Sequence, residues 1–319
     1  MNLSKSALVF PGQGSQSLGM LKDYFDNKTI FSKTFDEAKE ILDVDFKSLI
    51  FSDNKDDLSR TEITQPLMLA SNIAIWRELD LNSNSFGAMA GHSLGEYAAL
   101  VAGGVIEFHD ALNIVSVRAK LMQEAVPEGE GSIAAIIGLN QEAIELICSD
   151  ITNFKKELVC PANINSPIQI VISGSSRGVT LAMERCKEEG AKRAIPLAMS
   201  VPAHCKLMSA AADKFSHHLD DIKFQEPTIK IFQNYDASYT MNLEKIINNL
   251  VHQIDSPVRW VETIENIHSE GINIFIECGP GKVLSGLVKR TVNDVEIISL
   301  DDYSAFKAVS YTHLRAHET

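Results

Sequence analysis

The chain begins with short apolar runs that alternate with amphipathic stretches. Residues 7–10 (ALVF) form a continuous apolar run before the glycine-rich segment PGQGSQSLG, which predicts a buried strand and a loop. Residues 31–43 and 64–80 repeat apolar positions at the helical period, and Thr64 can cap the second helix with Pro66 in its first turn. Strands that alternate with helices build a mostly parallel sheet covered on both faces, so this part predicts an α/β domain.

A second order of elements follows the segment VPEGEG at residues 126–131. The pattern there predicts a strand, a helix, two strands, a helix and a strand. This βαββαβ order is typical of a ferredoxin-like unit. We therefore expect a ferredoxin-like subdomain at residues 129–198, inserted into a larger α/β domain formed by residues 1–128 and 199–308. Near the end, INIFIEC (272–278) predicts another buried strand, followed by GPGK and an amphipathic helix.

Residues 309–319 (VSYTHLRAHET) do not continue this pattern. They resemble a translated sequencing-library adapter, and we expect them to be a non-native tail. His313 and His317 have the spacing of a metalloprotease helix, but no glutamate follows His313, so no metal site is expected.

The net charge of −13 limits the partners of the chain, because strong negative charge disfavours nucleic acids and anionic membrane surfaces. Five widely spaced cysteines without a C-x-x-C pair indicate reduced thiols. No apolar run has the length of a membrane span, and residues 7–10 are too few for a signal sequence. We therefore expect a cytoplasmic protein that binds neither nucleic acid nor membrane.

The segment AMAGHSLGEYAAL contains the pattern G-x-S-x-G, with Ser93 between Gly91 and Gly95. An apolar strand precedes the pattern and a helix follows it, which is the context of a nucleophile on a sharp strand-to-helix turn. The glycines leave room for that turn, and the helix N-terminus stabilises negative charge on a bound carbonyl oxygen. A serine that merely caps a helix would also match the five-residue pattern, but the apolar strand before it favours a nucleophile.

A serine nucleophile needs a base, and the sequence leaves four histidines open. His204 lies in SVPAHCKLM, where the chain is expected to return to the larger domain, and loops at such junctions often carry catalytic groups. His109, His252 and His268 are the alternatives.

Arg118 interrupts the apolar helical stretch NIVSVRAKLM, and two interpretations are open. It is either a surface arginine whose alkyl chain lies along apolar neighbours, or a guanidinium that pairs with a substrate carboxylate. The glycine loops PGQGSQ and GPGK lack the spacing of nucleotide-binding motifs, so no cofactor is expected. A glycine-rich loop after a strand can instead present backbone N–H groups to an oxyanion.

Several motifs in a fixed order resemble those of the malonyl-CoA:acyl carrier protein transacylases of bacterial fatty acid synthesis. The resemblance covers about residues 5–305 and rests on FPGQGSQ, TQP, GHSLGEYAAL, Arg118, QEAVPEG, NSP, SVPAHC, PVRW and GPGKVLSGL. It implies a hydrolase-like α/β domain with a ferredoxin-like insertion, which agrees with the pattern of elements. One departure is Ile168 after NSP, where the family usually has glycine; it concerns the shape of that loop.

The resemblance also implies roles for single residues. Ser93 matches the acyl-accepting nucleophile, His204 its base, and Arg118 the arginine that holds the malonyl carboxylate. The remaining matches are backbone groups: the carbonyl that orients the imidazole, from Gln253, and the N–H groups of the oxyanion hole, from Gln13 and Leu94.

The implied reaction transfers a malonyl group from malonyl-CoA to the phosphopantetheine thiol of acyl carrier protein through a malonyl-serine ester. It needs neither a cofactor nor a metal, and we expect the enzyme to act as a monomer. The alternatives are an acyltransferase of a polyketide pathway, a serine esterase or thioesterase, and a non-catalytic acyl-binding module.

Overall fold

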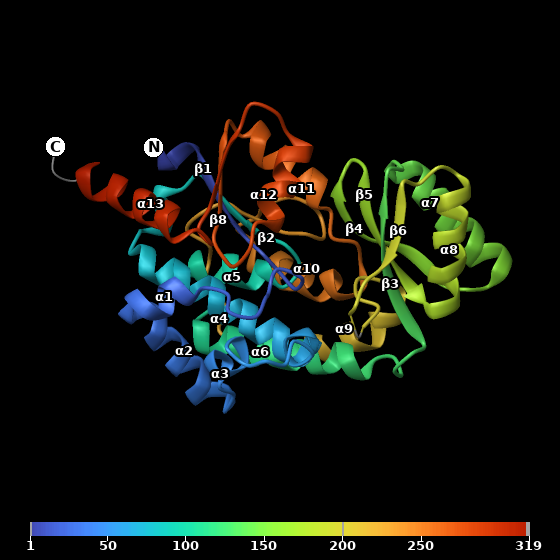
Figure 1. Cartoon of the computed structure of the whole chain (residues 1–319), viewed down its shortest axis with the longest axis horizontal. Helices are drawn as coiled ribbons and strands as arrows, with labels where there is room; N and C mark the ends of the chain where they lie inside the picture. Colours follow the sequence, from blue (N-terminus) through green and yellow to red (C-terminus); the bar gives the residue numbers. More distant parts are fainter. Residues whose placement is uncertain (1, 200, 317–319) are drawn as a thin grey trace.

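The apolar run ALVF lies in β1 (Ser6–Phe10), the central strand of a five-stranded parallel sheet with the order β7-β2-β1-β8-β9. The computed structural model describes residues 2–199 and 201–316, and this sheet is the centre of its larger unit (Figure 1). The mostly parallel α/β sheet predicted from the sequence is therefore confirmed. The other strands of this sheet are β2 (Ala88–Gly91), β7 (Ile231–Phe232), β8 (Ile274–Glu277) and β9 (Glu296–Ser299).

Alternate residues of β1 face two layers of helices, as the pleat of a strand requires. Leu8 and Phe10 pack in the main core, whereas Ala7 and Val9 pack in a second core on the other face. The main core includes α1 (Lys22–Asn27), α2 (Thr29–Leu42), α3 (Phe46–Ile50), α4 (Thr61–Leu79), α5 (Gly95–Ala102), α6 (Phe108–Glu124), α9 (Ser209–Leu219), α10 (Leu243–Asp255) and α13 (Tyr303–Ala316).

The second core is covered by α11 (Trp260–Ser269) and α12 (Val283–Thr291). Figure 1 shows these two helices above the sheet and α4, α5 and α6 below it. Among the described residues, no helix combines the length and the apolar character needed to cross a bilayer. Short 3₁₀ helices span Leu3–Lys5, Asp57–Ser59, Ser83–Ser85 and Lys206–Met208.

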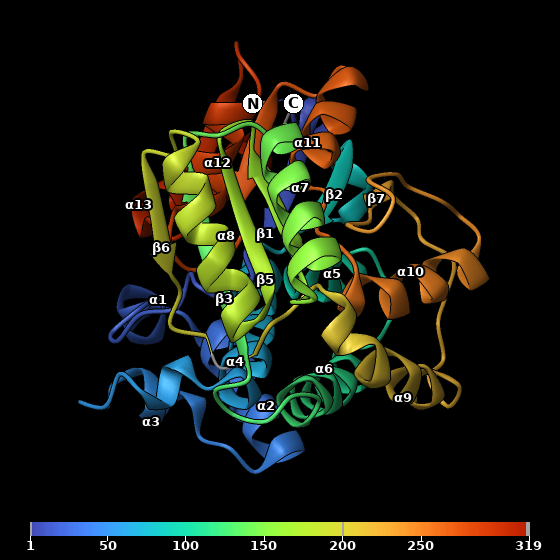
Figure 2. The same ribbon diagram turned by 90° about the vertical axis from the view of Figure 1, so that its right-hand side faces the viewer.

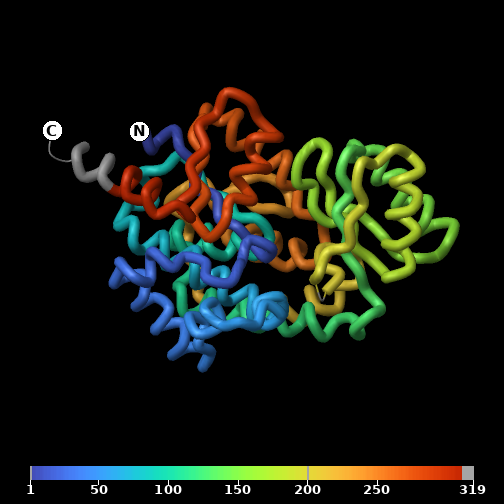
Figure 3. The backbone as a smooth tube through the Cα atoms, in the orientation of Figure 1, coloured from blue at the N-terminus to red at the C-terminus, as the bar shows by residue number. Residues whose placement is uncertain are grey.

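The smaller unit, green to yellow in Figure 3, contains a four-stranded antiparallel sheet with the order β4-β5-β3-β6. Two helices, α7 and α8, cover one face of this sheet, as Figure 2 shows. The strand and helix order matches the order that the sequence predicts for residues 129–198. The elements are β3 (Gly131–Ile137), α7 (Gln141–Asp150), a π-helical turn (Ile151–Lys155), β4 (Val159–Ser166), β5 (Gln169–Ser175), α8 (Ser176–Glu188) and β6 (Arg193–Pro196).

The other face of the small sheet carries no helix of its own unit and turns toward the larger unit. Ile133 of β3 and Val171 of β5 lie on this face, and both line a cavity that opens between the two units. The β4–β5 turn contains Ile168, which is 48% exposed and lies outside the left-handed φ region, so isoleucine is accommodated where the family usually has glycine.

Gly91 and Gly95 are required by close approaches of the backbone around β2. A Cβ atom on Gly91 would lie 1.9 Å from the carbonyl carbon of Gly95, and one on Gly95 would lie 2.0 Å from the carbonyl oxygen of Phe10. Neither position can accept a side chain unless β1 or α5 moves.

We expect Gly95→Ala to destabilise the protein by more than about 3 kcal/mol, because the added methyl group meets backbone that cannot yield. The matched control is Gly286→Ala in α12, where the nearest atom to the added Cβ is 3.5 Å away. That substitution should raise stability by about 0.5–1 kcal/mol through helix propensity. Urea unfolding measures both variants, and equal stabilities would contradict the close approach.

The segment predicted to be a non-native tail begins inside α13. Val309, its first residue, is buried in the main core together with Phe306. Residues 317–319 of the predicted tail lie outside the described residues. The origin of residues 309–319 stays a prediction.

Candidate active site

Ser93 lies on the turn between β2 and α5, at the carboxyl edge of the parallel sheet. Its φ of +50° falls in the left-handed region that residues other than glycine seldom adopt. Two hydrogen bonds of Asn234 hold this turn. Its Oδ1 accepts from the Ser93 backbone N–H at 2.6 Å, and its Nδ2 donates to the Gly91 carbonyl oxygen at 2.7 Å.

His204 reaches Ser93 from the segment that returns to the larger unit. Its Nε2 lies 2.7 Å from Ser93 Oγ, and its Nδ1 lies 2.7 Å from the backbone carbonyl oxygen of Gln253. A carbonyl oxygen only accepts hydrogen bonds, so the proton of the neutral ring belongs on Nδ1. Nε2 then has a lone pair directed at the serine hydroxyl.

Burial keeps this imidazole neutral. His204 is 3% exposed, and desolvation, reinforced by the positive charge of Arg118, lowers its pKa to about 3. A neutral imidazole beside a hydroxyl can take the hydroxyl proton as a general base. Throughout residues 2–199 and 201–316, no carboxylate hydrogen-bonds to the His204 ring, so the Gln253 carbonyl stands where many serine enzymes have an acid.

The three alternative bases lie elsewhere. His109 is exposed on α6 beside Asp110, and His252 stacks on Tyr235. His268 Nδ1 is 2.9 Å from the carbonyl oxygen of Ile272. None of the three contacts Ser93.

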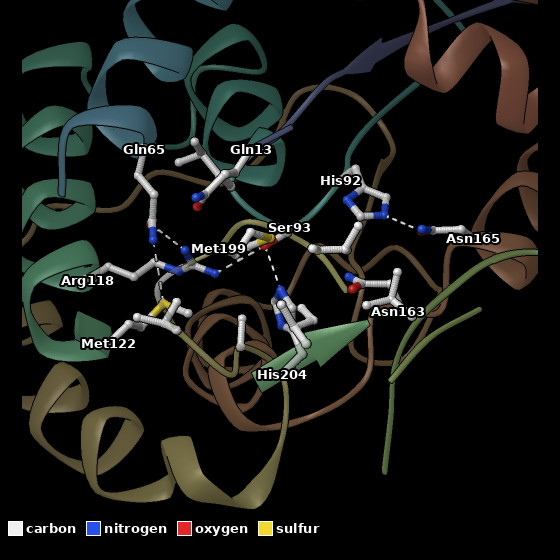
Figure 4. A pocket seen from close by; sticks show the side chains of 16 residues that line it. Gln13, Gln65, His92, Ser93, Arg118, Met122, Asn163, Asn165, Met199 and His204 are labelled. Atoms are coloured by element: carbon white, nitrogen blue, oxygen red, sulfur yellow. Dashed lines mark hydrogen bonds between the residues drawn. The ribbon is translucent and has the colours of Figure 1, made fainter. Parts of the chain in front are cut away.

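His92, next to the serine in sequence, points away from it toward the smaller unit, as Figure 4 shows. Its Nε2 lies 2.7 Å from Asn165 Oδ1, and its ring meets Trp260 edge-on at 5.3 Å between centroids. Desolvation lowers the pKa of His92. Its role in the fold is to join the serine turn to β4.

Arg118 is buried rather than a surface arginine, with only 1% of its surface exposed. Its Nη1 donates to Gln65 Oε1 at 2.5 Å, and its Nη2 donates to Gln253 Oε1 at 3.0 Å. Nη2 also lies 3.4 Å from Ser93 Oγ, and Nε has no hydrogen-bond partner among the described residues. Within the described part of the chain, the guanidinium has no carboxylate partner, so its charge is available to a bound anion.

Gln13 and Leu94 both line the cavity. The loop after β1 approaches the start of α5 so closely that a Cβ on Gly12 would lie 3.7 Å from the Leu94 nitrogen. In the described residues, neither the Gln13 nor the Leu94 backbone N–H donates a hydrogen bond. One unused donor on the loop after β1 and one at the start of α5 are suited to an oxyanion.

The cavity has a volume of about 120 Å³ and lies between the two units (Figure 4). Ser93, His204 and Arg118 form its polar end. The rest of the lining includes the apolar residues Ile133, Val171, Leu197 and Met199.

Sequence reasoning missed Gln65, Glu96 and Asn234 around this site, and it assigned Gln253 a role only for its backbone carbonyl. The Gln65 and Gln253 side chains bind Arg118, and Glu96 lies behind them. Gln65 falls in the TQP motif and Glu96 in GHSLGEYAAL, but nothing in either motif shows which atom a side chain would contact.

Taken together, these groups place a hydroxyl, a neutral base, two oxyanion donors and a fixed cation in one cavity. Such a set can take up an acyl group that itself carries a negative charge. No part of this set requires a metal or an organic cofactor.

Residues 7–307 match the family model described as the acyl transferase domain. The chain is 45% identical over 309 residues to the malonyl CoA-acyl carrier protein transacylase of Haemophilus influenzae, covering 96% of this chain and 98% of that protein. A crystal structure of an acyl carrier protein S-malonyltransferase from Vibrio cholerae matches with a TM-score of 0.90 at 45% identity, over 96% of this chain and 99% of that one.

A second solved structure is PlMCAT, a malonyl-transacylase in complex with AntF, a type II PKS acyl-carrier protein. It matches with a TM-score of 0.93 at 44% identity, covering 96% of this chain and 99% of that one.

Proposed function

The chain belongs to the acyl transferase domain family and, within it, to the malonyl-CoA:acyl carrier protein transacylases, and from this premise we propose how it works. It moves a malonyl group from malonyl-CoA to the phosphopantetheine thiol of acyl carrier protein. The group passes through an ester on Ser93, so the two substrates react in turn.

In the first half-reaction, Ser93 Oγ attacks the thioester carbonyl carbon while His204 Nε2 takes the hydroxyl proton. The carbon–sulfur bond then breaks, and the imidazolium gives its proton to the departing CoA sulfur. In the second half-reaction, the carrier thiol gives its proton to His204 and attacks the ester carbonyl carbon. The proton passes to Ser93 Oγ as the ester bond breaks.

Each half-reaction forms a tetrahedral intermediate with a negative oxygen. The Gln13 and Leu94 backbone N–H groups, both unused within the described residues, are the donors we assign to that oxygen. Losing one donor of this kind costs about 2.7–4 kcal/mol of transition-state stabilisation.

Arg118 selects the acyl group in this proposal. Its guanidinium is buried and lies beside the serine hydroxyl, so a malonyl carboxylate can pair with it. An acetyl group would leave the buried charge without a partner, a penalty of roughly 3–5 kcal/mol.

One observation carries the proposal: Ser93 Oγ is 2.7 Å from a neutral His204 nitrogen and 3.4 Å from the Arg118 guanidinium. Brief exposure of the protein to malonyl-CoA should therefore leave a malonyl ester on Ser93, detectable by mass spectrometry of the peptide. Addition of acyl carrier protein with its phosphopantetheine arm should remove the ester. An unlabelled serine would contradict the proposed intermediate, and release of free malonate at the rate of transfer would indicate a hydrolase.

The second candidate for the acceptor is the acyl carrier protein of a polyketide pathway. The similarity to PlMCAT, which was solved with a type II PKS acyl-carrier protein, favours it specifically. Comparing kcat/KM for a fatty acid carrier and a polyketide carrier would distinguish the two.

The strand order β4-β5-β3-β6 with two helices on one face supports assigning the smaller unit to the ferredoxin-like class. The five free cysteines are consistent with a reducing, cytoplasmic compartment. Oligomeric state and location stay predictions.

A further inference from the structure

Glu96 is a fully buried carboxylate on the first turn of α5, and the reaction steps above do not use it. It accepts three hydrogen bonds, all from neutral amides. The donors are Gln233 Nε2 at 3.1 Å, the Asn234 backbone N–H at 2.7 Å and Gln253 Nε2 at 2.9 Å. In the described part of the chain, it forms no ion pair within 4.0 Å. A buried charge without an ion pair is costly, so its presence beside the site calls for a reason.

Glu96 determines which way the Gln253 amide faces. An ionised carboxylate only accepts hydrogen bonds, so it binds the NH₂ end of that amide. The second hydrogen of Gln253 Nε2 goes to the Ser93 carbonyl oxygen at 3.0 Å, and the opposite end, Oε1, accepts from Arg118 Nη2 at 3.0 Å. A flipped amide would set oxygen against the carboxylate and NH₂ against the guanidinium, and both contacts would be repulsive.

Glu96 also anchors the segment that supports the serine turn. The Asn234 backbone N–H binds Glu96, while the Asn234 side chain binds the Ser93 N–H and the Gly91 carbonyl. The strained φ at Ser93 is therefore held by a side chain whose own backbone is fixed by the carboxylate. Through Asn234 and Gln253, Glu96 connects to both sides of the turn.

The arrangement leaves the Arg118 charge open. Gln65 and Gln253 hold the guanidinium through amide oxygens, which are neutral acceptors. A carboxylate in direct contact would neutralise Arg118 and compete with a substrate carboxylate. Glu96 instead binds the far end of the Gln253 amide, where it orients the oxygen that accepts from Arg118 without contacting the guanidinium itself.

We propose that Glu96 is a positioning residue for acyl transfer. It fixes the Gln253 amide and the Asn234 side chain that supports the Ser93 turn, and so holds the Arg118 guanidinium and Ser93 Oγ at the separation that a malonyl group requires. This inference rests on the proposed function, because it takes the malonyl group as the substrate that requires this separation.

The protonation of Glu96 gives the proposal a signature that a purely structural side chain would lack. Desolvation raises its pKa to about 7, although its three hydrogen bonds and Arg118 oppose that shift. The groups facing it are Arg118 from α6, the neutral amides of Gln253 from α10, those of Gln233 and Asn234 from the segment after β7, and Tyr97 from its own helix. Protonation as the pH falls through about 7 takes away one of the contacts that favour this amide direction and leaves only those to Arg118 and the Ser93 carbonyl, so the acylation rate should fall there.

The test is single-turnover acylation of Ser93 by malonyl-CoA, followed by rapid quenching between about pH 6 and about pH 8.5. We expect Glu96→Gln to slow acylation about 30-fold at neutral pH and to remove the fall on the acid side. The matched control is Glu277→Gln. Glu277 is also a fully buried glutamate with three neutral donors, the Leu284 N–H, the Ser285 N–H and the Ser285 hydroxyl, and none of these donors belongs to a residue that contacts Ser93 or Arg118. Its variant should acylate within about twofold of the wild-type rate.

A wild-type rate and acid limb in Glu96→Gln would overturn the proposal, as would equal slowing in the Glu277→Gln control. If Glu96→Gln does not fold, Glu96→Asp takes its place, because the shorter side chain keeps the carboxylate but cannot hold both the Gln253 amide and the Asn234 N–H at hydrogen-bond distance. A wild-type acylation rate in that variant would contradict the positioning role. Absence of any ester on wild-type Ser93 would instead refute the proposed function, and this inference with it.

Discussion

Ser93→Ala should lower malonyl transfer to acyl carrier protein by about 10⁴-fold or more, because alanine lacks the hydroxyl that forms the ester intermediate. Within the described residues, Ser93 Oγ forms hydrogen bonds with His204 and Arg118, so alanine removes the nucleophile without breaking the backbone hydrogen bonds of the turn. The measurement is the initial rate of malonyl-carrier formation, together with the mass of the protein after exposure to malonyl-CoA.

Binding provides the control for this variant. Arg118 remains in Ser93→Ala, so malonyl-CoA should still raise its melting temperature, as expected for a ligand that binds the folded state. A variant that transfers malonyl groups at a measurable fraction of the wild-type rate would mean that Ser93 is not the acyl acceptor.

Arg118→Ala should lower kcat/KM for malonyl-CoA by at least about 100-fold, because the malonyl carboxylate loses its buried partner. Acetyl-CoA, which has no carboxylate, should lose far less or should gain, since alanine leaves no unpaired cation in the cavity. The quantity to measure is the ratio of the two kcat/KM values in the wild type and in the variant.

The same variant supplies its own internal comparison. The substitution also frees the Gln65 and Gln253 amide oxygens and removes bulk from the cavity, and those effects act on both acyl donors. Equal losses for malonyl-CoA and acetyl-CoA would therefore assign Arg118 a structural role instead of a selective one.

The sequence predicts those parts of the fold that carry a strong pattern of their own. The apolar runs of β1 and β8 and the helical period of α4 and α6 identify these elements within a few residues. By contrast, β7 has only two residues, too few for any period, and its partner β2 lies far away in the chain. Pattern analysis cannot find such a strand, because pairing with β2 defines it.

The site shows the same division. The pattern G-x-S-x-G already predicts that residues 91 and 95 must lack a side chain. The structure shows why, because backbone atoms approach both positions closely. The choice among His204, His109, His252 and His268 depends on distances between segments, which residue order does not contain. Likewise, the sequence does not show which end of a glutamine amide faces a guanidinium. The contacts of the Gln253 side chain with Arg118 and the Ser93 carbonyl can therefore be found only from the three-dimensional structure.

The contact between His204 Nδ1 and the Gln253 carbonyl limits which leaving groups the site can expel. A carbonyl dipole stabilises an imidazolium less than a full negative charge would, so protonated His204 is short-lived and a strong acid. Thiolates leave readily because thiols ionise near about pH 8.5, and they need little help from an acid. We therefore expect this site to transfer acyl groups between thioesters in both directions. It should not cleave amides, because an amide nitrogen must be protonated before it departs.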